Sequence, residues 1–294
     1  MTQAFELNQE LLQPAANEST EPAALWFGVK LFDLVALLTV FSMFRISHLP
    51  LDMALTVAAA ILVCLKAVRR SPWFWFGIVV AWLPRMYFDF QHYEDHCFFV
   101  IYWCGAMGLA VMGRRVEFSM RNSARLMIGL CFALGCIWKV ISPEFYDGSL
   151  FHFKLLFDYR FEEMVTGPIG GLSSLTSASN LESYRNVRMA LPGGEAAIEI
   201  PGRVTWIAYL MTVWTIVIEG ALAWAFLFSG KLAERSRDFV LMFFMLSTYF
   251  VVPVMGFASI FMTLGIAQTR SNRMRVAYVG THLLLFAWYT FRMG

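Results

Sequence analysis

The chain has 294 residues, of which 59% are hydrophobic and only 15% are charged, and its mean hydropathy is +0.59. This composition is typical of a polytopic membrane protein and not of a soluble domain. The formal net charge of +2 is too small to indicate a nucleic-acid or acidic partner. Charge therefore matters through its placement between the apolar segments.

Residues 1–23 form a polar arm ahead of the first apolar run. The arm carries four glutamates and no lysine or arginine, which is opposite to the charged start of a secretory signal. We expect it to be retained in the mature protein. Residues 24–294 are then predicted to form one transmembrane helical domain.

Eight apolar runs can cross a bilayer of about 30 Å as helices. They are 24–44, 51–68, 73–88, 96–112, 124–141, 204–230, 239–267 and 276–291. The run 239–267 is longer than one upright span requires, and Pro253 and Gly256 interrupt it, so it must tilt, kink or fold back on itself. We predict an all-α bundle of about eight transmembrane helices with one long external loop.

The distribution of basic residues predicts the orientation. Connections after the second, fourth and sixth runs each hold three lysines or arginines, whereas those after the first and third offer only Arg45 and Arg85. The positive-inside rule then places the N-terminus in the cytoplasm, in what we expect to be a bacterial inner membrane. Arg270, Arg273 and Arg275 disagree with this topology if 239–267 crosses the membrane once.

The connection 142–203 is predicted to be an external cap. Phe151, Leu155 and Tyr159 recur at helical spacing, which predicts an interfacial helix. The small-residue stretch 166–179 fits a plain loop as well as a ligand cradle, and 194–203 fits a short strand pair. A loop of this length in a compact membrane protein is more often a cap than a spacer.

Cysteine and histidine spacing does not indicate a metal site or a disulfide framework. The five cysteines contain no CxxC pair, so packing is the expected role. His92 and His96 have the spacing of a metal pair on a helix, but the chain holds only five histidines, and HYEDH is not the HExxH of zinc proteases. We expect no metal.

Lys139 is the central residue of the functional prediction. It ends an apolar run where the polarity of the bilayer changes, so burial can adjust the charge of its amine. The alternative is a lysine that extends its ammonium to the lipid headgroups. A second polar cluster, 85–96, reaches the same membrane face, and there Arg85 and Asp89 are spaced to pair.

Two further ionisable positions lie inside apolar runs. Glu219 is near the middle of its run, where a carboxylate needs a proton, a partner or a polar cavity. Lys30 and Asp33 are spaced to neutralise each other in the first run.

The order of these residues resembles a known family. YEDHCFFVIYW contains Asp95 and His96, WKVISPEFYDG contains Lys139, and TIVIEGALAW contains Glu219. Together they resemble the horizontally transferred transmembrane domain, which is the membrane domain of vitamin K-dependent gamma-glutamyl carboxylase and its bacterial relatives. The resemblance covers roughly residues 31–228. Asp95 stands where the family has asparagine, and the large external domain of the carboxylase has no counterpart here.

The resemblance implies a quinol-linked, carboxylase-like lyase. By analogy, Lys139 would be the base that acts on a reduced, vitamin K-like quinone, and His96 would lie near the same pocket. The residues expected to bind this cofactor are Asp95, Glu219, Trp138 and Tyr146. Base chemistry requires a neutral lysine, which a site of low dielectric favours.

Two other functions remain open from the sequence. The chain fits a non-catalytic membrane subunit or assembly factor of a partner complex, and it also fits a small transporter, although we find no internal repeat. The expected partners are the lipid bilayer, a lipophilic small molecule and a membrane or external protein, with no nucleic acid.

Overall fold

The computed structural model describes residues 30–44, 50–88, 90, 93–189, 198–252 and 254–293. The predicted polar arm 1–23, together with Asp89 and His92, lies outside these residues. Within them the chain is all-helical, as predicted. The long helices are α2 (Leu31–Met43), α3 (Pro50–Cys64), α5 (Pro72–Phe88), α6 (Asp95–Met112), α7 (Val116–Ile141), α12 (Gly202–Leu227), α13 (Lys231–Tyr249), α14 (Met255–Gln268) and α15 (Asn272–Met293), with a short α4 (Lys66–Arg69) between α3 and α5.

Three described helices, α6, α7 and α12, are long and apolar enough to cross a membrane. The outer faces of α7 and α12 expose leucine and valine side chains, among them Leu134 at 65% and Leu210 at 70%. Such continuous apolar surface is suited to lipid rather than water. The molecule is therefore a membrane protein. Helices α2, α3 and α14 are apolar but shorter, so eight separate spans are a prediction and not a finding.

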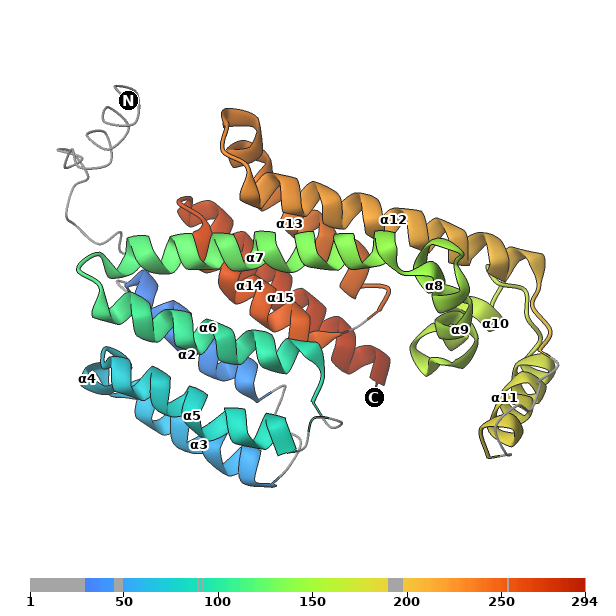
Figure 1. Ribbon diagram of the computed structural model, residues 1–294, viewed down its shortest axis with the longest axis horizontal. Coiled ribbons are helices and arrows are strands. Elements are labelled where there is room, and N and C mark those ends of the chain that lie inside the picture. The colour runs from blue at the N-terminus through green and yellow to red at the C-terminus, as the bar shows by residue number, and fades with distance from the viewer. Residues whose placement is uncertain are drawn as a thin grey trace.

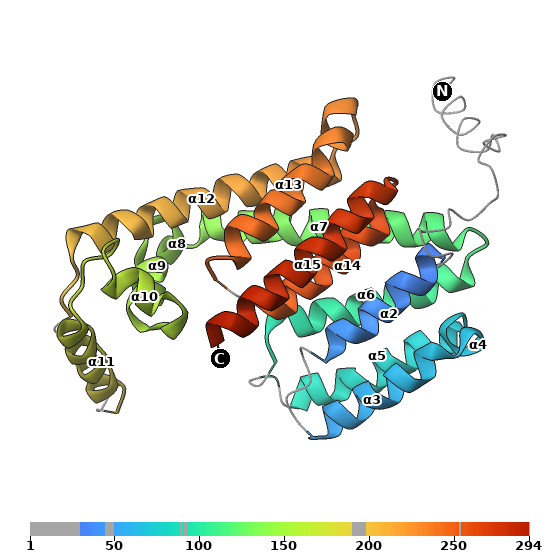
Figure 2. The same cartoon turned by 180° about the vertical axis from the view of Figure 1, so that it is seen from behind.

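The apolar run 239–267 forms two helices instead of one span. α13 ends at Tyr249 and α14 begins at Met255, and the two run in opposite directions (Figures 1 and 2). The break falls where the sequence has Pro253, a residue that cannot donate a backbone hydrogen bond to a continuing helix. Of the alternatives raised by the sequence, folding back is the one observed.

This reversal changes where the C-terminal arginines lie. The α14–α15 turn is at the same end of the bundle as α4, the α6–α7 turn and the α12–α13 turn (Figures 1 and 2). Arg270 and Arg273 are therefore at the end that also carries Arg114 and Lys231. The conflict that the single-span interpretation created is removed. We call this the basic end of the bundle.

The main core lies between the antiparallel helices. Its largest fully buried side chains include Trp75, Trp82 and Trp103, and Trp103 donates from its indole to the Thr39 hydroxyl at 2.8 Å. Helices α7 and α12 approach closely at Gly129, where a Cβ would lie 2.6 Å from a methyl carbon of Leu227. A side chain at this position would require the Leu227 side chain to move, so the glycine permits the close approach.

The cap follows α7 as α8 (Pro143–Tyr146), α9 (Ser149–Phe157), a 3₁₀ turn η2 (Tyr159–Phe161), α10 (Glu162–Thr166) and α11 (Ser174–Met189). Figures 1 and 2 show it beside the part of α12 that extends past the end of α7. A second, smaller core joins the two and consists of Leu155, Phe161, Val165, Leu172, Val204 and Ala208. The outer half of α12 is thus the support of the cap.

Details of the cap differ from the expectations. Phe151 and Leu155 lie in the expected helix, but Tyr159 falls in the 3₁₀ turn. The small-residue stretch 166–179 becomes helical from Ser174. The predicted strand pair is absent from the described part of 194–203. Instead, the Asn180 side chain hydrogen-bonds both the N–H and the C=O of Glu199, which satisfies backbone groups that a paired strand would have taken.

Candidate functional site

Lys139 and Glu219 form an ion pair between α7 and α12. The Lys139 Nζ atom lies 2.7 Å from Oε1 and 2.6 Å from Oε2 of Glu219. Both side chains are largely buried, with 14% and 12% of their surfaces exposed. The expectation that Glu219 has a polar partner in the protein interior is confirmed. A carboxylate facing lipid at this depth would cost several kcal/mol, and the lysine removes that cost.

Small residues make room for the pair. Gly135 lies one turn before Lys139, and a Cβ on it would be 3.2 Å from Glu219 Oε2. On the other helix Gly220 faces the Cys136 sulfur, 3.7 Å from where its Cβ would be. The Lys139 ammonium also lies over the Phe145 ring of α8, 5.2 Å from its centroid, within the range of a cation–π contact.

The pair is deeper along α12 than the sequence alone indicates. Lys139 is close to the last residue of α7, but Glu219 lies in the inner half of α12. The N-terminal part of α12, from Gly202 to Glu219, therefore extends for about 25 Å beyond the pair, at 1.5 Å per residue. Because α8 and α9 lie beside that extension (Figure 1), protein rather than headgroups covers the outer side of Lys139.

His96 is buried at the start of α6, with 4% of its surface exposed. Its Nδ1 lies 3.3 Å from Glu94 Oε2, and its ring meets Phe257 of α14 edge-on at 5.3 Å. A Cβ on Gly256 would overlap the imidazole, so this glycine creates the space for the ring. His96 thus faces α14, whereas Lys139 faces α12 and α8.

An aromatic cluster lies between these two positions. Phe257 stacks on Phe261 at 5.8 Å, and Phe261 packs against Phe244 at 6.4 Å. Phe244 meets Tyr249 at 5.5 Å. Tyr249 is 5% exposed and lies within electrostatic range of Glu219. Sequence reasoning missed Tyr249, although a tyrosine inside an apolar run is a signal that a hydroxyl needs a protein partner.

The remaining predicted site residues lie on the surface of this region. Asp95 is exposed at the start of α6. Trp138 is 53% exposed and meets the Phe145 ring edge-on at 5.2 Å, whereas Tyr146 is 63% exposed. Trp138 therefore shares an aromatic neighbour with Lys139.

The pair suggested by spacing between Lys30 and Asp33 is replaced by a pair between helices, and Arg85 also has a partner on another helix. The predicted partner of Arg85, Asp89, lies outside the described residues. Asp33 accepts from Arg69 Nε at 2.9 Å, and Arg85 donates to Asp52 of α3 at 2.5 Å. Tyr93 donates to the same carboxylate at 2.9 Å. Contacts between helices prevail here because a neighbouring helix can bury the pair, whereas partners on one helix surface interact only weakly.

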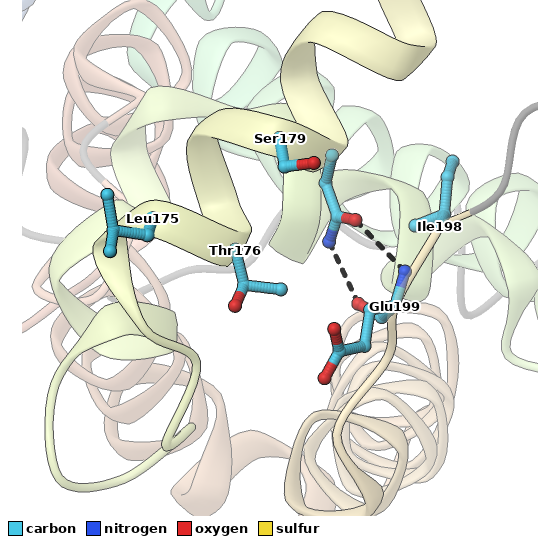
Figure 3. A pocket seen from close by; sticks show the side chains of 6 residues that line it. Leu175, Thr176, Ser179, Ile198 and Glu199 are labelled. Atoms are coloured by element: carbon cyan, nitrogen blue, oxygen red, sulfur yellow. Dashed lines mark hydrogen bonds between the residues drawn. The ribbon is translucent and has the colours of Figure 1, made fainter.

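Hollows lie around the described part of the cap. The first, of about 540 Å³, is an open depression between α11 and residues 198–199; Figure 3 shows Thr176, Ser179 and Glu199 on its walls, with the Asn180 hydrogen bonds beside them. Glu199 is the one ionisable group among the described residues that line it.

The second hollow, which we call the aromatic groove, has a volume of about 480 Å³ and is lined by Phe161, Phe250, Trp288 and Phe291 together with Arg160, Glu163, Met164, Ile169 and Val251. Phe250 and Trp288 stack at 4.2 Å. Phe250 follows Tyr249 in the chain, but neither Lys139 nor Glu219 is among the described residues that line the groove.

The thiols and carboxylates of this region do not form a metal centre within the described residues. No group of three or more histidine, cysteine, aspartate or glutamate side chains there has the geometry of a metal site. All five cysteines are free thiols, and four of them are at least partly buried, which is consistent with packing.

A comparison of the chain with protein-family models, with curated proteins and with solved structures gives no match.

Proposed function

We propose that this protein is a membrane enzyme that binds a reduced quinone, and that the Lys139–Glu219 pair accepts a proton in its reaction. The observation that carries the proposal is the burial of this pair between two membrane-crossing helices. Buried, ionisable groups that are costly to maintain in a membrane are a functional hypothesis by default. The resemblance to the carboxylase membrane domain supplies the reaction class.

The pair provides a route to a neutral lysine. Transfer of one proton from Lys139 Nζ to Glu219 Oε2, across 2.6 Å, leaves an uncharged amine beside a protonated carboxyl group. In a medium of low dielectric this neutral form is favoured relative to its population in water. The amine can then accept a proton from a hydroxyl group that approaches it, and Glu219 keeps the first proton meanwhile. Both residues are thus assigned to one proton-accepting unit.

The aromatic groove suits a flat, lipophilic ring. Its described walls are mainly apolar, with four aromatic residues and the charged residues Arg160 and Glu163 among them. Such a combination binds amphipathic ring systems by stacking and a few polar contacts. A reduced quinone, when bound, would supply an ionisable phenolic hydroxyl. The residues of this chain that would hold it are those of the groove. Tyr249, which precedes Phe250 in the chain, lies within electrostatic range of Glu219.

The test is a conservative substitution at the base. Lys139→Arg keeps the positive charge and its pairing with Glu219, but a guanidinium stays protonated in proteins and cannot accept a proton. We expect quinol-dependent turnover of the purified protein to be lost in Lys139→Arg and in Lys139→Ala. Lys154→Arg, in the cap, is the matched control and should turn over normally.

Analysis of bound lipophilic molecules completes the test. Organic extracts of the purified wild-type protein should contain a quinone. Equal turnover in wild type and Lys139→Arg, or a protein that never co-purifies with or oxidises a quinol, would refute the assignment.

A second candidate is a non-catalytic membrane subunit, in which the ion pair only fastens α7 to α12. The mutual satisfaction of the two charges favours it, because Lys139 and Glu219 are each within hydrogen-bonding distance of the other. The exchange variant Lys139→Glu/Glu219→Lys separates the candidates. A structural pair should tolerate the exchange with full function, whereas a proton-accepting lysine placed on the wrong helix should leave a folded but inactive protein.

A further inference from the structure

Four arginines gather at the basic end of the bundle, on three different helices. Arg121 and Arg125 lie on α7, Arg237 on α13 and Arg275 on α15, and we call them the arginine cluster. Arg125 is close enough to Arg237 for the two positive charges to repel each other, and the same is true of Arg121 and Arg275. In both ribbon views the start of α13 and the α14–α15 turn lie beside the first half of α7 (Figures 1 and 2). Like charges have therefore been brought together.

Two members of the cluster are held by backbone carbonyl groups. Arg237 is 9% exposed and donates to the carbonyl oxygens of Ala225 and Phe228 at the end of α12, at 2.7 and 3.0 Å. Arg275 is 2% exposed and donates to the carbonyl oxygen of Thr269 at 3.0 Å. Basic side chains at helix C-termini are stabilising, but a carbonyl group does not neutralise their charge.

Among the described residues, carboxylates do not neutralise Arg125, Arg237 or Arg275 either. Asp238 is near Arg237 in the chain, but its oxygens accept from Gln268, Thr269 and Tyr278. The described residues place no carboxylate within ion-pair distance of Arg125, Arg237 or Arg275. Glu117, Glu234 and Asp238 lie within electrostatic range of Arg237 or Arg275 but beyond ion-pair distance of both.

Some donors of the cluster are also unsatisfied. In the part of the chain that the structure describes, the Nε atoms of Arg125 and Arg275 are buried without a hydrogen-bond partner. A buried donor without an acceptor costs stability, more so when it carries charge. Repelling charges and unused donors at one place indicate an anionic ligand that supplies acceptor oxygens.

We propose that the arginine cluster binds the phosphate group of an anionic phospholipid. A guanidinium presents its donors in a planar fork that matches a phosphate, and basic pockets between membrane helices are suited to lipid headgroups. The cluster lies beside the first half of α7, a helix long and apolar enough to cross the membrane, and headgroups are concentrated near the ends of such helices. This proposal is independent of the quinone reaction, because the site is at the opposite end of α7 from Lys139.

The test measures thermal unfolding of the full-length protein in detergent. Phosphatidylglycerol, phosphatidylcholine and inorganic phosphate are added separately at equal phosphate concentration. A ligand that binds only the folded state raises the Tm, and the stabilisation grows with the logarithm of one plus the ratio of the ligand concentration to Kd. We expect phosphatidylglycerol to raise the Tm by several degrees and the other two to have little effect.

Arg125→Gln is the decisive variant, because Arg125 makes no hydrogen bond to another described residue and its removal breaks no helix cap. Loss of one charge-assisted contact should weaken phosphatidylglycerol binding about tenfold. Arg235→Gln, an exposed arginine on α13, is the matched control and should keep the full Tm increase. Native mass spectrometry of both proteins provides a second measurement, since phosphatidylglycerol adducts should persist in Arg235→Gln and decrease in Arg125→Gln.

An equal Tm increase in wild type and Arg125→Gln would overturn the proposal. So would an equal increase with inorganic phosphate, because the site would then bind a soluble anion and not a lipid.

Discussion

Glu219 accepts two hydrogen bonds from one lysine: Lys139 Nζ lies 2.7 Å from Oε1 and 2.6 Å from Oε2. These two residues belong to the two longest helices that can cross the membrane, and their contact is the strongest polar link between them. The remainder of that helix interface is built from close apolar packing, as at Gly129. The pair therefore fixes the relative position of α7 and α12 along their axes.

Removing one partner of this pair should strongly lower the free energy of unfolding. Removing both partners should lower it by less than the sum of the two single losses. Either Lys139→Ala or Glu219→Ala leaves one buried charge uncompensated, for which we expect a loss of about 3 kcal/mol or more in unfolding free energy. The double variant leaves no such charge. Denaturant unfolding in detergent of the wild type and the three variants measures the coupling, and strictly additive losses would show that the pair is not formed.

Gly256→Ala should destabilise the interface between α6 and α14. A methyl group at this position overlaps the imidazole of His96, so the ring or the helix must move, at a cost of about 1 to 3 kcal/mol. Gly280→Ala is the control, because a Cβ on Gly280 meets nothing within 4 Å and alanine favours helix. We expect Gly256→Ala to lower the Tm and Gly280→Ala to raise it. An unchanged Tm in Gly256→Ala would contradict the packing described for His96.

Labelling of single cysteines tests the orientation. Leu175→Cys, in the exposed start of α11, should react with a membrane-impermeant maleimide in intact cells. Arg115→Cys and Arg270→Cys, at the basic end, should react only after permeabilisation. The background should carry Cys64→Ser, because Cys64 is the exposed native thiol. Reaction of the position 115 or 270 thiol from outside intact cells would reverse the topology.

The pH dependence of cap stability follows from Asp158. Burial raises the pKa of its carboxyl group, but the hydrogen bonds from Arg160 and the charge of Arg160 together lower this pKa by more. The pKa of Asp158 is therefore below its ordinary value. A folded pKa below the unfolded pKa of about 3.9 means that the carboxylate stabilises the cap above that pH. This stabilisation is lost as the pH falls through the folded pKa.

Hydrogen exchange in residues 155–166, corrected for the intrinsic effect of pH, should therefore accelerate in acid for the wild type. Asp158→Asn should exchange faster at neutral pH and show a weaker dependence on acid. Glu182→Gln, an exposed carboxylate on α11, serves as the control and should behave like the wild type. Identical acid profiles for the wild type and Asp158→Asn would exclude this role of Asp158.

The sequence by itself determined the class of the protein and the positions of most helices. Apolar runs must bury or face lipid, so composition and run length predict membrane helices, and the run 73–88 coincides closely with α5. The need of Glu219 for a polar partner was also predictable, because a lone carboxylate is costly at membrane depth. The identity of that partner was suggested only by the family resemblance, which placed Lys139 in the same site as Glu219.

Tertiary structure decided which groups meet. The reversal between α13 and α14 depends on packing against the other helices, and no local pattern distinguishes it from a kinked span. Arg85 pairs with Asp52 and Asp33 with Arg69, because side chains far apart in sequence become neighbours only after the helices assemble. The arginine cluster has the same origin: its members come from three helices, and their repulsion exists only in the folded bundle.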